Sequence, residues 1–219
     1  FRATVARDAP HPLIAINTHE MGRLSRIVNP LMTPVTHELM PSSAAPGQMS
    51  VRAIHEARHL LGLLPRRRLF LLGSPIAQSQ SPLIHNTGFQ VLGLPHVYER
   101  FETSTVDERL VQLLHAPDFG GASVTIPLKL SIMQLLDSIS PEAQVIGAVN
   151  TIVPRRDSDT GRVALHGENT DWHAIYDRAR AAHVRSDGLV ALVIGAGGSA
   201  RAALYAMHRL GASCILLYN

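Results

Sequence analysis

The residue whose chemistry stands out in this sequence is Lys129, the only lysine. The chain has 20 basic Lys and Arg residues, and 19 of them are arginine. Arginine stays protonated in proteins, whereas a lysine amine can release and take back a proton. A position that keeps lysine in such a chain indicates acid–base chemistry, although chance retention of one last lysine would give the same count.

Two polar segments each follow a predicted strand and could form one binding crevice. The first runs from Gly73 to Pro82 and the second from Ser123 to Lys129. Ligands bind outside the carboxyl ends of the strands in open α/β sheets, so we expect both segments at one edge. Ser79 and Ser81 offer hydroxyl donors beside a helix opened by proline, which suits a carboxylate. The alternative is that these serines only cap that helix.

Two further segments add amide and carboxylate groups. They are Gly147-Ala148-Val149-Asn150-Thr151 and Gly167-Glu168-Asn169-Thr170-Asp171-Trp172. The carboxylate of Asp171 could take part in a site at this edge of the sheet. The alternative role of Asp171 is the N-cap of a helix that starts at Trp172.

A glycine-rich turn predicts a dinucleotide site near the end of the chain. Apolar residues 189–194 run into Gly195-Ala196-Gly197-Gly198-Ser199-Ala200-Arg201-Ala202-Ala203, and a helix and a strand at 214–218 follow. Glycines permit a tight turn whose N–H groups approach a pyrophosphate, and small residues after it let the helix pack closely on the strand. The alternative is a tight strand-to-helix connection without a ligand. The residues that separate NAD from NADP lie at the end of the second strand.

The order of the expected elements indicates an α/β fold with a mainly parallel sheet. Strands are expected at 69–72, 96–101, 121–125, 148–153 and 191–194, and helices at 82–92, 106–114, 129–136, 172–182 and 199–210. Before them, residues 12–17 have the pattern of a buried strand, 22–28 that of a helical turn, and 50–64 that of a helix with Ser50 as N-cap and Pro65 as its stop. Domain boundaries are expected at 65–68 and 186–188.

Composition excludes several classes of protein. Hydrophobic residues make up 46% of the chain and charged residues 17%, which is not the signature of intrinsic disorder. The formal charge of +3 is too small for a nucleic-acid footprint, and the densest basic run, Arg66 to Arg68, reads as a solvated linker. A single cysteine excludes a disulfide framework, and the 12 histidines form no metal-ligand cluster, so no metal is expected.

The distribution of apolar residues along the chain predicts the cellular compartment. No stretch approaches the length of a membrane span and no signal peptide is visible, which predicts a soluble intracellular protein. The chain starts at Phe1 and stops after an apolar run, so we expect a piece of a longer polypeptide.

In their order, these motifs resemble the shikimate dehydrogenase family over residues 69–219. The resemblance implies a substrate-binding and catalytic domain at 65–187 and the first βαβ of an NADP-binding Rossmann domain at 188–219. It implies that Lys129 and Asp171 are the catalytic pair and that the substrate is bound by Ser79, Ser81, Thr125, Asn150 and Thr170. It places NADP against Gly195, Ala196, Gly197, Gly198, Ser199 and Asn219. The family often has His in place of Gln78 and Asn in place of Ser123.

Residues 1–64 resemble a different family, the C-terminal end of type I dehydroquinase, which is a TIM barrel. The matching pieces are residues 22–26 and 45–48. The resemblance implies that Arg26 grips a substrate carboxylate and that Gln48 sits on a lid loop. Residues 18–19 and 42–44 depart from common versions of these motifs. Because only the last strands are covered, we expect an incomplete barrel that packs poorly.

Dehydroquinase followed by shikimate dehydrogenase is the order in fungal pentafunctional arom polypeptides. This resemblance implies NADP-dependent interconversion of 3-dehydroshikimate and shikimate, in the cytoplasm, with a homodimer formed through the parent polypeptide. The alternative is a fungal quinate repressor, a nuclear protein that resembles arom polypeptides and senses quinate or shikimate without catalysis. The retained Lys129 and Asp171 favour the enzyme, and the imperfect dehydroquinase tail favours the repressor.

One expectation holds under either alternative. One βαβ unit is half of what normally holds a dinucleotide, so we expect these 219 residues to be inactive alone. The choice between shikimate and quinate stays open.

Overall fold

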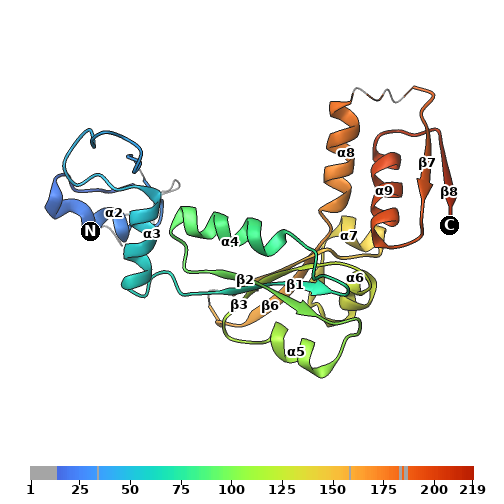
Figure 1. Cartoon of the computed structure of the whole chain (residues 1–219), viewed down its shortest axis with the longest axis horizontal. Coiled ribbons are helices and arrows are strands. Elements are labelled where there is room, and N and C mark those ends of the chain that lie inside the picture. Colours follow the sequence, from blue (N-terminus) through green and yellow to red (C-terminus); the bar gives the residue numbers. More distant parts are fainter. Residues whose placement is uncertain (1–13, 34, 158, 183, 185–186) are drawn as a thin grey trace. The chain divides into compact units, whose positions relative to one another are not determined.

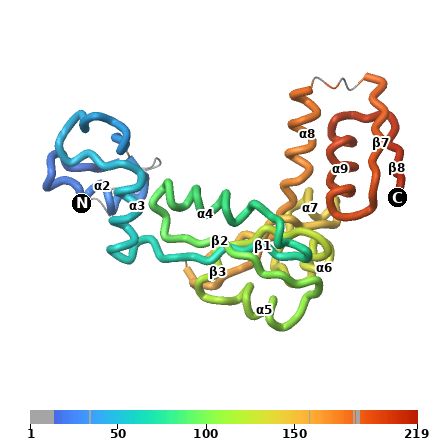
Figure 2. The backbone as a smooth tube through the Cα atoms, viewed as in Figure 1, coloured from blue at the N-terminus to red at the C-terminus, as the bar shows by residue number. Residues whose placement is uncertain are grey.

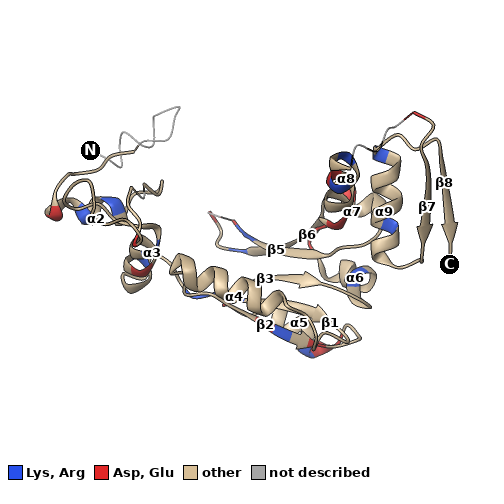
Figure 3. Ribbon diagram, turned by 45° about the horizontal axis from the view of Figure 1, so that its top comes forward, with Lys and Arg blue, Asp and Glu red and all other residues tan. Residues whose placement is uncertain are grey.

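The computed structural model describes residues 14–33, 35–157, 159–182, 184 and 187–219. The chain forms two compact units. The first comprises residues 1–67 with 83–97, and the second comprises residues 68–82 with 98–219. Basic and acidic residues are interspersed along both units in Figure 3, which agrees with the small net charge.

The first unit combines helices with irregular segments. It contains η1 (Glu20–Gly22), α2 (Arg23–Ile27), α3 (Val51–Leu60) and most of α4 (Ser81–Leu92). Ser50 caps α3, because its Oγ accepts the N–H of Ala53 at 3.1 Å, as predicted. The predicted extension of this helix to residue 64 is wrong. Gly62 adopts φ +71° and the N–H of Leu63 bonds the carbonyl of Arg58 at 2.8 Å, which closes the helix early.

The strand expected at residues 12–17 is another difference. Residues 12 and 13 lie outside the described part of the chain, and residues 14–17 form no strand. Ile14 and Ile16 are exposed, since no described strand pairs with this segment. An apolar run folds as a strand only when a neighbour completes its hydrogen bonds.

The second unit is built on a six-stranded sheet of order β2-β1-β3-β5-β6-β4 and a two-stranded sheet of β7 and β8. The strands are β1 (Arg68–Gly73), β2 (Val97–Glu102), β3 (Phe119–Val124), β4 (Ser138–Ile139), β5 (Thr151–Arg156), β6 (Val163–Glu168), β7 (Val190–Ile194) and β8 (Cys214–Tyr218). The helices are α5 (Glu108–Leu114), α6 (Leu128–Ser131), η2 (Ile132–Leu135), α7 (Pro141–Ile146), α8 (Asp171–Ala181) and α9 (Gly198–Arg209).

The predicted α/β class is confirmed. β1 pairs with β3, β4 with β6 and β7 with β8 in parallel. β5 is antiparallel to both β3 and β6, and just after β5 the Oδ1 of Asp157 accepts the N–H of Thr160 at 2.7 Å. β4, α7 and β6 were not predicted, and Arg68 belongs to β1 rather than to a linker, with its Nε 2.7 Å from Glu99 Oε2.

Two apolar clusters hold this unit together. The larger lies against the six-stranded sheet and includes Phe70, Leu72, Leu110, Leu128, Ile132 and Ile152. The smaller joins α7, α8 and α9 through Ile146, Ala148, Trp172, Ala202 and Ala206. Figure 1 shows α8 and α9 side by side, and the tube in Figure 2 follows the chain from β7 through α9 to β8. The second cluster therefore fixes the glycine-rich turn relative to the start of α8.

Candidate functional site

Lys129 lies in α6 and bonds to two residues that are distant in sequence. Its Nζ donates to Asp171 Oδ2 at 2.6 Å and to Ser199 Oγ at 3.0 Å. The backbone is also tied down, because the carbonyl of Lys129 accepts the N–H of Val149 at 2.8 Å. Only 12% of the Lys129 side chain and 27% of the Asp171 side chain is exposed, so the pair is largely shielded from water.

Asp171 is the first residue of α8, and its carboxylate faces the lysine. Oδ1 accepts Asn150 Nδ2 at 2.8 Å while Oδ2 accepts the lysine. The alternative role as N-cap is wrong, because Thr170 occupies the cap position and makes no side-chain capping bond. A carboxylate at a helix N-terminus is stabilised by the positive end of the helix dipole.

Asn150 joins the start of β5 to the start of α8. Its Nδ2 donates to Thr170 Oγ1 at 2.9 Å, and its Oδ1 accepts the N–H of Thr170 at 2.9 Å. Asn169, which sequence reasoning did not assign to the site, is buried beneath them. It donates to the carbonyl of Ala148 at 2.9 Å and accepts the N–H of Asp171 at 3.1 Å. The sequence signal for Asn169 was its place beside Thr170 and Asp171. A buried amide needs hydrogen-bond partners for both its nitrogen and its oxygen.

Ser79 and Ser81 lie just before and at the start of α4. Ser79 Oγ is 3.2 Å from Ser81 Oγ and accepts the N–H of Ser81 at 3.2 Å. Ser81 is itself the first residue of α4 and so does not occupy its cap position. Arg100 Nη2 donates to the carbonyl of Ser79 at 2.6 Å, which adds a positive charge beside this turn.

A cavity of about 360 Å³ brings the predicted substrate-side residues together. Its walls include all seven residues predicted for catalysis or substrate binding, together with the two positions that depart from the family pattern: Ser79, Ser81, Thr125, Lys129, Asn150, Thr170, Asp171, Gln78 and Ser123. Behind it, burial raises the pKa of Tyr98, and a hydrogen bond with Ser123 acts in the opposite direction. The cavity is therefore lined mainly by hydroxyl and amide groups with one ion pair.

The glycine-rich turn lies between β7 and α9. Gly195 has φ +112°, and its N–H bonds the carbonyl of Tyr218 at 2.7 Å. A Cβ at Gly197 would meet nothing within 4 Å, so space is open in front of the N-terminus of α9. Unpaired N–H groups at the start of such a helix suit a pyrophosphate, and these residues fit a dinucleotide.

The predicted cofactor residues do not all share one cavity. Gly195 and Ala196 line a second cavity of about 510 Å³, together with residues of α7, α9 and β8. Ser199 instead reaches Lys129, and Asn219 is exposed after β8. Of the predicted cofactor residues, Gly195 and Ala196 thus face this second cavity.

The two dehydroquinase-like residues both belong to the first unit. Arg26 is 7% exposed, and its Nη1 has no hydrogen-bond partner among the described residues. Gln48 Oε1 accepts the N–H of Ala44 at 3.0 Å and lines a cavity of about 340 Å³ that does not include Arg26.

The described residues contain neither a membrane-spanning helix nor a metal-ligand group. They contain no helix with the length and apolar character needed to cross a membrane. They also contain no group of three or more His, Cys, Asp or Glu side chains placed to hold a metal ion.

Comparison with known families divides the chain in two. Residues 71–152 match the shikimate dehydrogenase substrate binding domain, and residues 1–65 match type I 3-dehydroquinase. The match to the shikimate dehydrogenase substrate binding domain includes Lys129 and most residues that line the cavity, whereas Thr170, Asp171 and Ser199 lie beyond the matched residues.

Individual relatives agree. The chain is 71% identical over 220 residues to the pentafunctional AROM polypeptide of Malassezia globosa, covering 100% of this chain and 14% of that one. A structure of dehydroquinate dehydratase and shikimate dehydrogenase from S. pombe AroM is 50% identical with a TM-score of 0.79, covering 99% of this chain and 41% of the other.

A bacterial structure is also similar. It is shikimate 5-dehydrogenase from Thermus thermophilus in complex with NADP(H) and shikimate, 34% identical, with a TM-score of 0.57, covering 69% of this chain and 56% of the other. The chain therefore spans only about a seventh of the M. globosa polypeptide and about half of the bacterial enzyme.

Proposed function

We propose that this chain is the substrate-binding and proton-transfer part of an NADP-dependent shikimate dehydrogenase within an AROM-type polypeptide. The observation that carries the proposal is the Lys129–Asp171 pair, 2.6 Å apart, on the wall of a cavity lined by hydroxyl and amide groups. The reaction would interconvert shikimate and 3-dehydroshikimate.

The cavity offers separate groups for the two ends of such a substrate. The hydroxyls of Ser79 and Ser81 and the backbone at the start of α4 would bind the carboxylate. Thr125, Asn150 and Thr170 line the same cavity and would bind ring hydroxyls. Lys129 therefore meets a hydroxyl rather than the carboxylate.

Proton transfer is the task of Lys129. A neutral amine has two N–H donors, which Asp171 and Ser199 accept, and a lone pair that is left for the hydroxyl proton of the substrate. During oxidation of the alcohol, that proton moves to the Nζ lone pair, and the C–H hydride would pass to the nicotinamide when it is bound. Asp171 stays ionised, holds the amine in place and stabilises the resulting positive charge.

NADP would bind at the glycine-rich turn, with Gly195 to Ser199 around its pyrophosphate and Asn219 near the 2′-phosphate. The open space at Gly197 and the N-terminus of α9 support this placement. When bound, the nicotinamide supplies the hydride acceptor.

Several finer points belong to the same proposal. The domains are residues 65–187 for substrate and 188–219 for the start of the NADP domain, with a dehydroquinase-like tail at 1–64 in which Arg26 and Gln48 are the residues of interest. The parent polypeptide would be a cytoplasmic homodimer. We do not propose the nuclear repressor, because the relatives reported above are named as enzymes and no contact in the described chain favours a sensor.

The test uses the full-length protein that carries this sequence. Absorbance of reduced nicotinamide is followed with NADP and either shikimate or quinate, and Lys129→Ala is the matched variant. We expect turnover with shikimate that falls by about 10² to 10⁴ in the variant, the usual range for an acid–base group. Shikimate binding without turnover in the wild type would contradict the proposal.

A further inference from the structure

Lys129 is held by side chains from two separate helices. Asp171 is 42 residues away in sequence and opens α8, and Ser199 is 70 residues away and is the second residue of α9. The first bond is an ion pair, and the second joins the amine to the glycine-rich turn. The proton-transfer group and the dinucleotide turn are thus in direct contact.

The stem of Lys129 also depends on this turn. A Cβ on Gly198 would lie 3.0 Å from Lys129 Cδ, 3.1 Å from Lys129 Cβ and 3.3 Å from Ala148 Cβ. All three distances are shorter than ordinary van der Waals contact. The lysine stem therefore lies directly against the glycine, and the next residue reaches its Nζ.

Packing holds Ser199 in this place. Ala202 and Ala206 on α9 are fully buried in the cluster that includes Trp172 of α8. The rings of Trp172 and Tyr205 meet edge to face, with centroids 5.0 Å apart. Because α8 carries Asp171, the same helix pair positions both partners of the amine.

We propose that Ser199 is a positioning residue for Lys129 and links the dinucleotide turn to proton transfer. A serine hydroxyl can accept from Nζ and at the same time donate its own hydrogen to an anionic acceptor. At the N-terminus of α9 that acceptor is a phosphate oxygen of a dinucleotide. Occupation of the turn then aligns the amine, because each bond in such a chain polarises the next.

The inference rests on the proposed function. It goes beyond that function, because a serine that only bound the cofactor would have no effect on Lys129. Ser199→Ala removes the hydroxyl, Ser199→Thr keeps it, and Ser213→Ala is the matched control. Ser213 lies in the same βαβ unit but bonds the carbonyl of Leu189, away from the site.

Two measurements on the full-length protein separate the roles. In steady-state kinetics, we expect Ser199→Ala to lower kcat about tenfold, the order expected from a displaced catalytic group, with KM for shikimate unchanged. Ser199→Thr should restore most of kcat, and Ser213→Ala should match the wild type.

The second measurement needs neither substrate nor cofactor. The rate at which an amine-acylating reagent modifies Lys129 is followed by peptide mass spectrometry, which resolves this site because Lys129 is the only lysine within these 219 residues of the full-length protein. We expect the acylation rate to change about threefold or more in Ser199→Ala, because one hydrogen bond to a charged group is lost. In Ser199→Thr the rate should return to that of the wild type.

The outcomes are distinct. A higher KM for NADP with unchanged kcat and unchanged acylation would show a cofactor ligand only and overturn the inference. Equal loss in the alanine and threonine variants would point to packing rather than the hydroxyl, and would also overturn it. Absence of dehydrogenase turnover in the wild type would refute the proposed function, while the acylation rates would still report on Ser199.

Discussion

At the scale of single residues, the amine of Lys129 makes hydrogen bonds that an arginine could not reproduce. Its Nζ, on the wall of the cavity, bonds a carboxylate and a hydroxyl and can release a proton, whereas a guanidinium is planar and stays protonated. Charge alone is abundant in this chain, which has 19 arginines. What Lys129 adds is therefore a removable proton.

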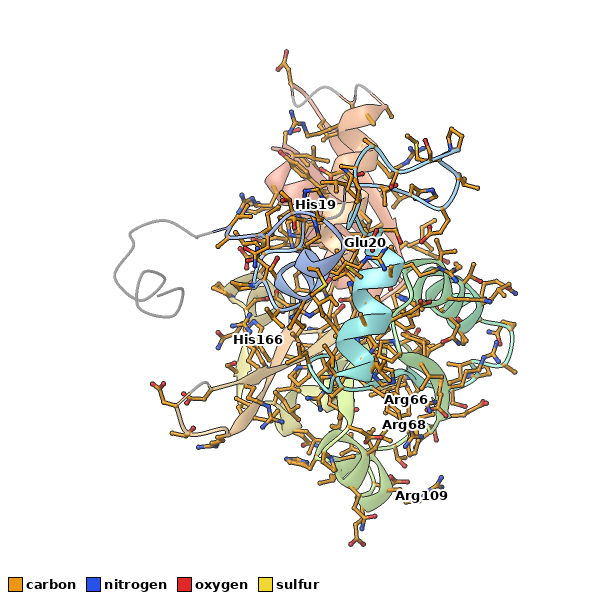
Figure 4. All side chains as sticks on the ribbon, turned by 90° about the vertical axis from the view of Figure 1, so that its left-hand side faces the viewer. His19, Glu20, Arg66, Arg68, Arg109 and His166 are labelled. Carbon is orange, nitrogen blue, oxygen red and sulfur yellow. The ribbon has the colours of Figure 1, made fainter. Side chains whose placement is uncertain are left out.

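This difference predicts the behaviour of Lys129→Arg. We expect the full-length variant to lose shikimate oxidation by about 10² to 10⁴, as an alanine variant does, because the charge is kept and proton release is not. The measurement is the initial rate of NADP reduction. Arg109→Lys is a matched control, since Arg109, labelled in Figure 4, is an exposed side chain of α5 and does not line the cavity. Near wild-type turnover in Lys129→Arg would rule out the acid–base role.

A second prediction at this scale concerns pH. Burial opposes ionisation of Glu168, but hydrogen bonds from Ser140 and His166 and the charges of His166 and Arg155 outweigh it and lower the pKa of this carboxyl. His166, labelled in Figure 4, is buried with its Nε2 2.9 Å from Glu168 Oε1. A lowered carboxyl pKa stabilises the fold above the ordinary pKa, and that contribution disappears as pH falls through the folded-state value.

We therefore expect Glu168→Gln to lower the free energy of unfolding at about pH 7, with the difference from wild type shrinking between about pH 5 and pH 2. Urea unfolding at several pH values measures it. Glu56→Gln, at an exposed position of α3, should show no such trend. A pH-independent difference would mean that Glu168 acts through packing.

At the scale of elements, short helices that pack on the sheet depend on their caps. Asp107 Oδ1 accepts the N–H of Leu110 at 2.9 Å at the start of α5, and Leu110 is fully buried in the larger cluster. A seven-residue helix is too short to be stable by itself, so its cap and its buried face must fix it.

We expect Asp107→Ala to reduce the free energy of unfolding by about 0.5 to 2 kcal/mol, with Asp107→Asn near wild type, because asparagine caps as well as aspartate does. Chemical denaturation of the two variants gives the comparison. Equal losses in both would show that the negative charge, rather than the capping bond, matters there.

At the scale of the whole second unit, helix packing assembles the site. α8 carries Asp171, α9 carries Ser199, and alanines at their contact allow the close approach that lets both reach Lys129. Larger side chains at this contact would push the helices apart.

Ala202→Leu tests this arrangement. We expect about 1 to 3 kcal/mol of destabilisation from overpacking, together with lower kcat, while the affinity for shikimate in the absence of NADP is retained. Isothermal titration and steady-state rates on the full-length protein measure the two effects. Ala174→Leu, at an exposed position of α8, should change neither. Loss of shikimate affinity in Ala202→Leu would show that the cavity itself depends on α9.

Sequence by itself determined the α/β class, the cap at Ser50, the glycine-rich turn and the substrate-side residues that line the cavity. These features are local. Short windows of sequence are enough to show alternating elements, a serine before a helix and polar residues at strand ends. The residues expected at the strand ends do share one cavity, because a parallel sheet brings those ends to one edge.

Tertiary structure alone decided the rest. The antiparallel β5–β6 pair and the short β4 depend on partners distant in sequence, so no local pattern specified them. Residues 14–17 read as a strand but pair with none in the described chain. Asp171 could have capped its own helix, and only the approach of α6 and β5 directs its carboxylate to Lys129 and Asn150. The bond from Lys129 to Ser199 joins residues 70 apart, and only the packing of α9 on α8 brings them within 3.0 Å.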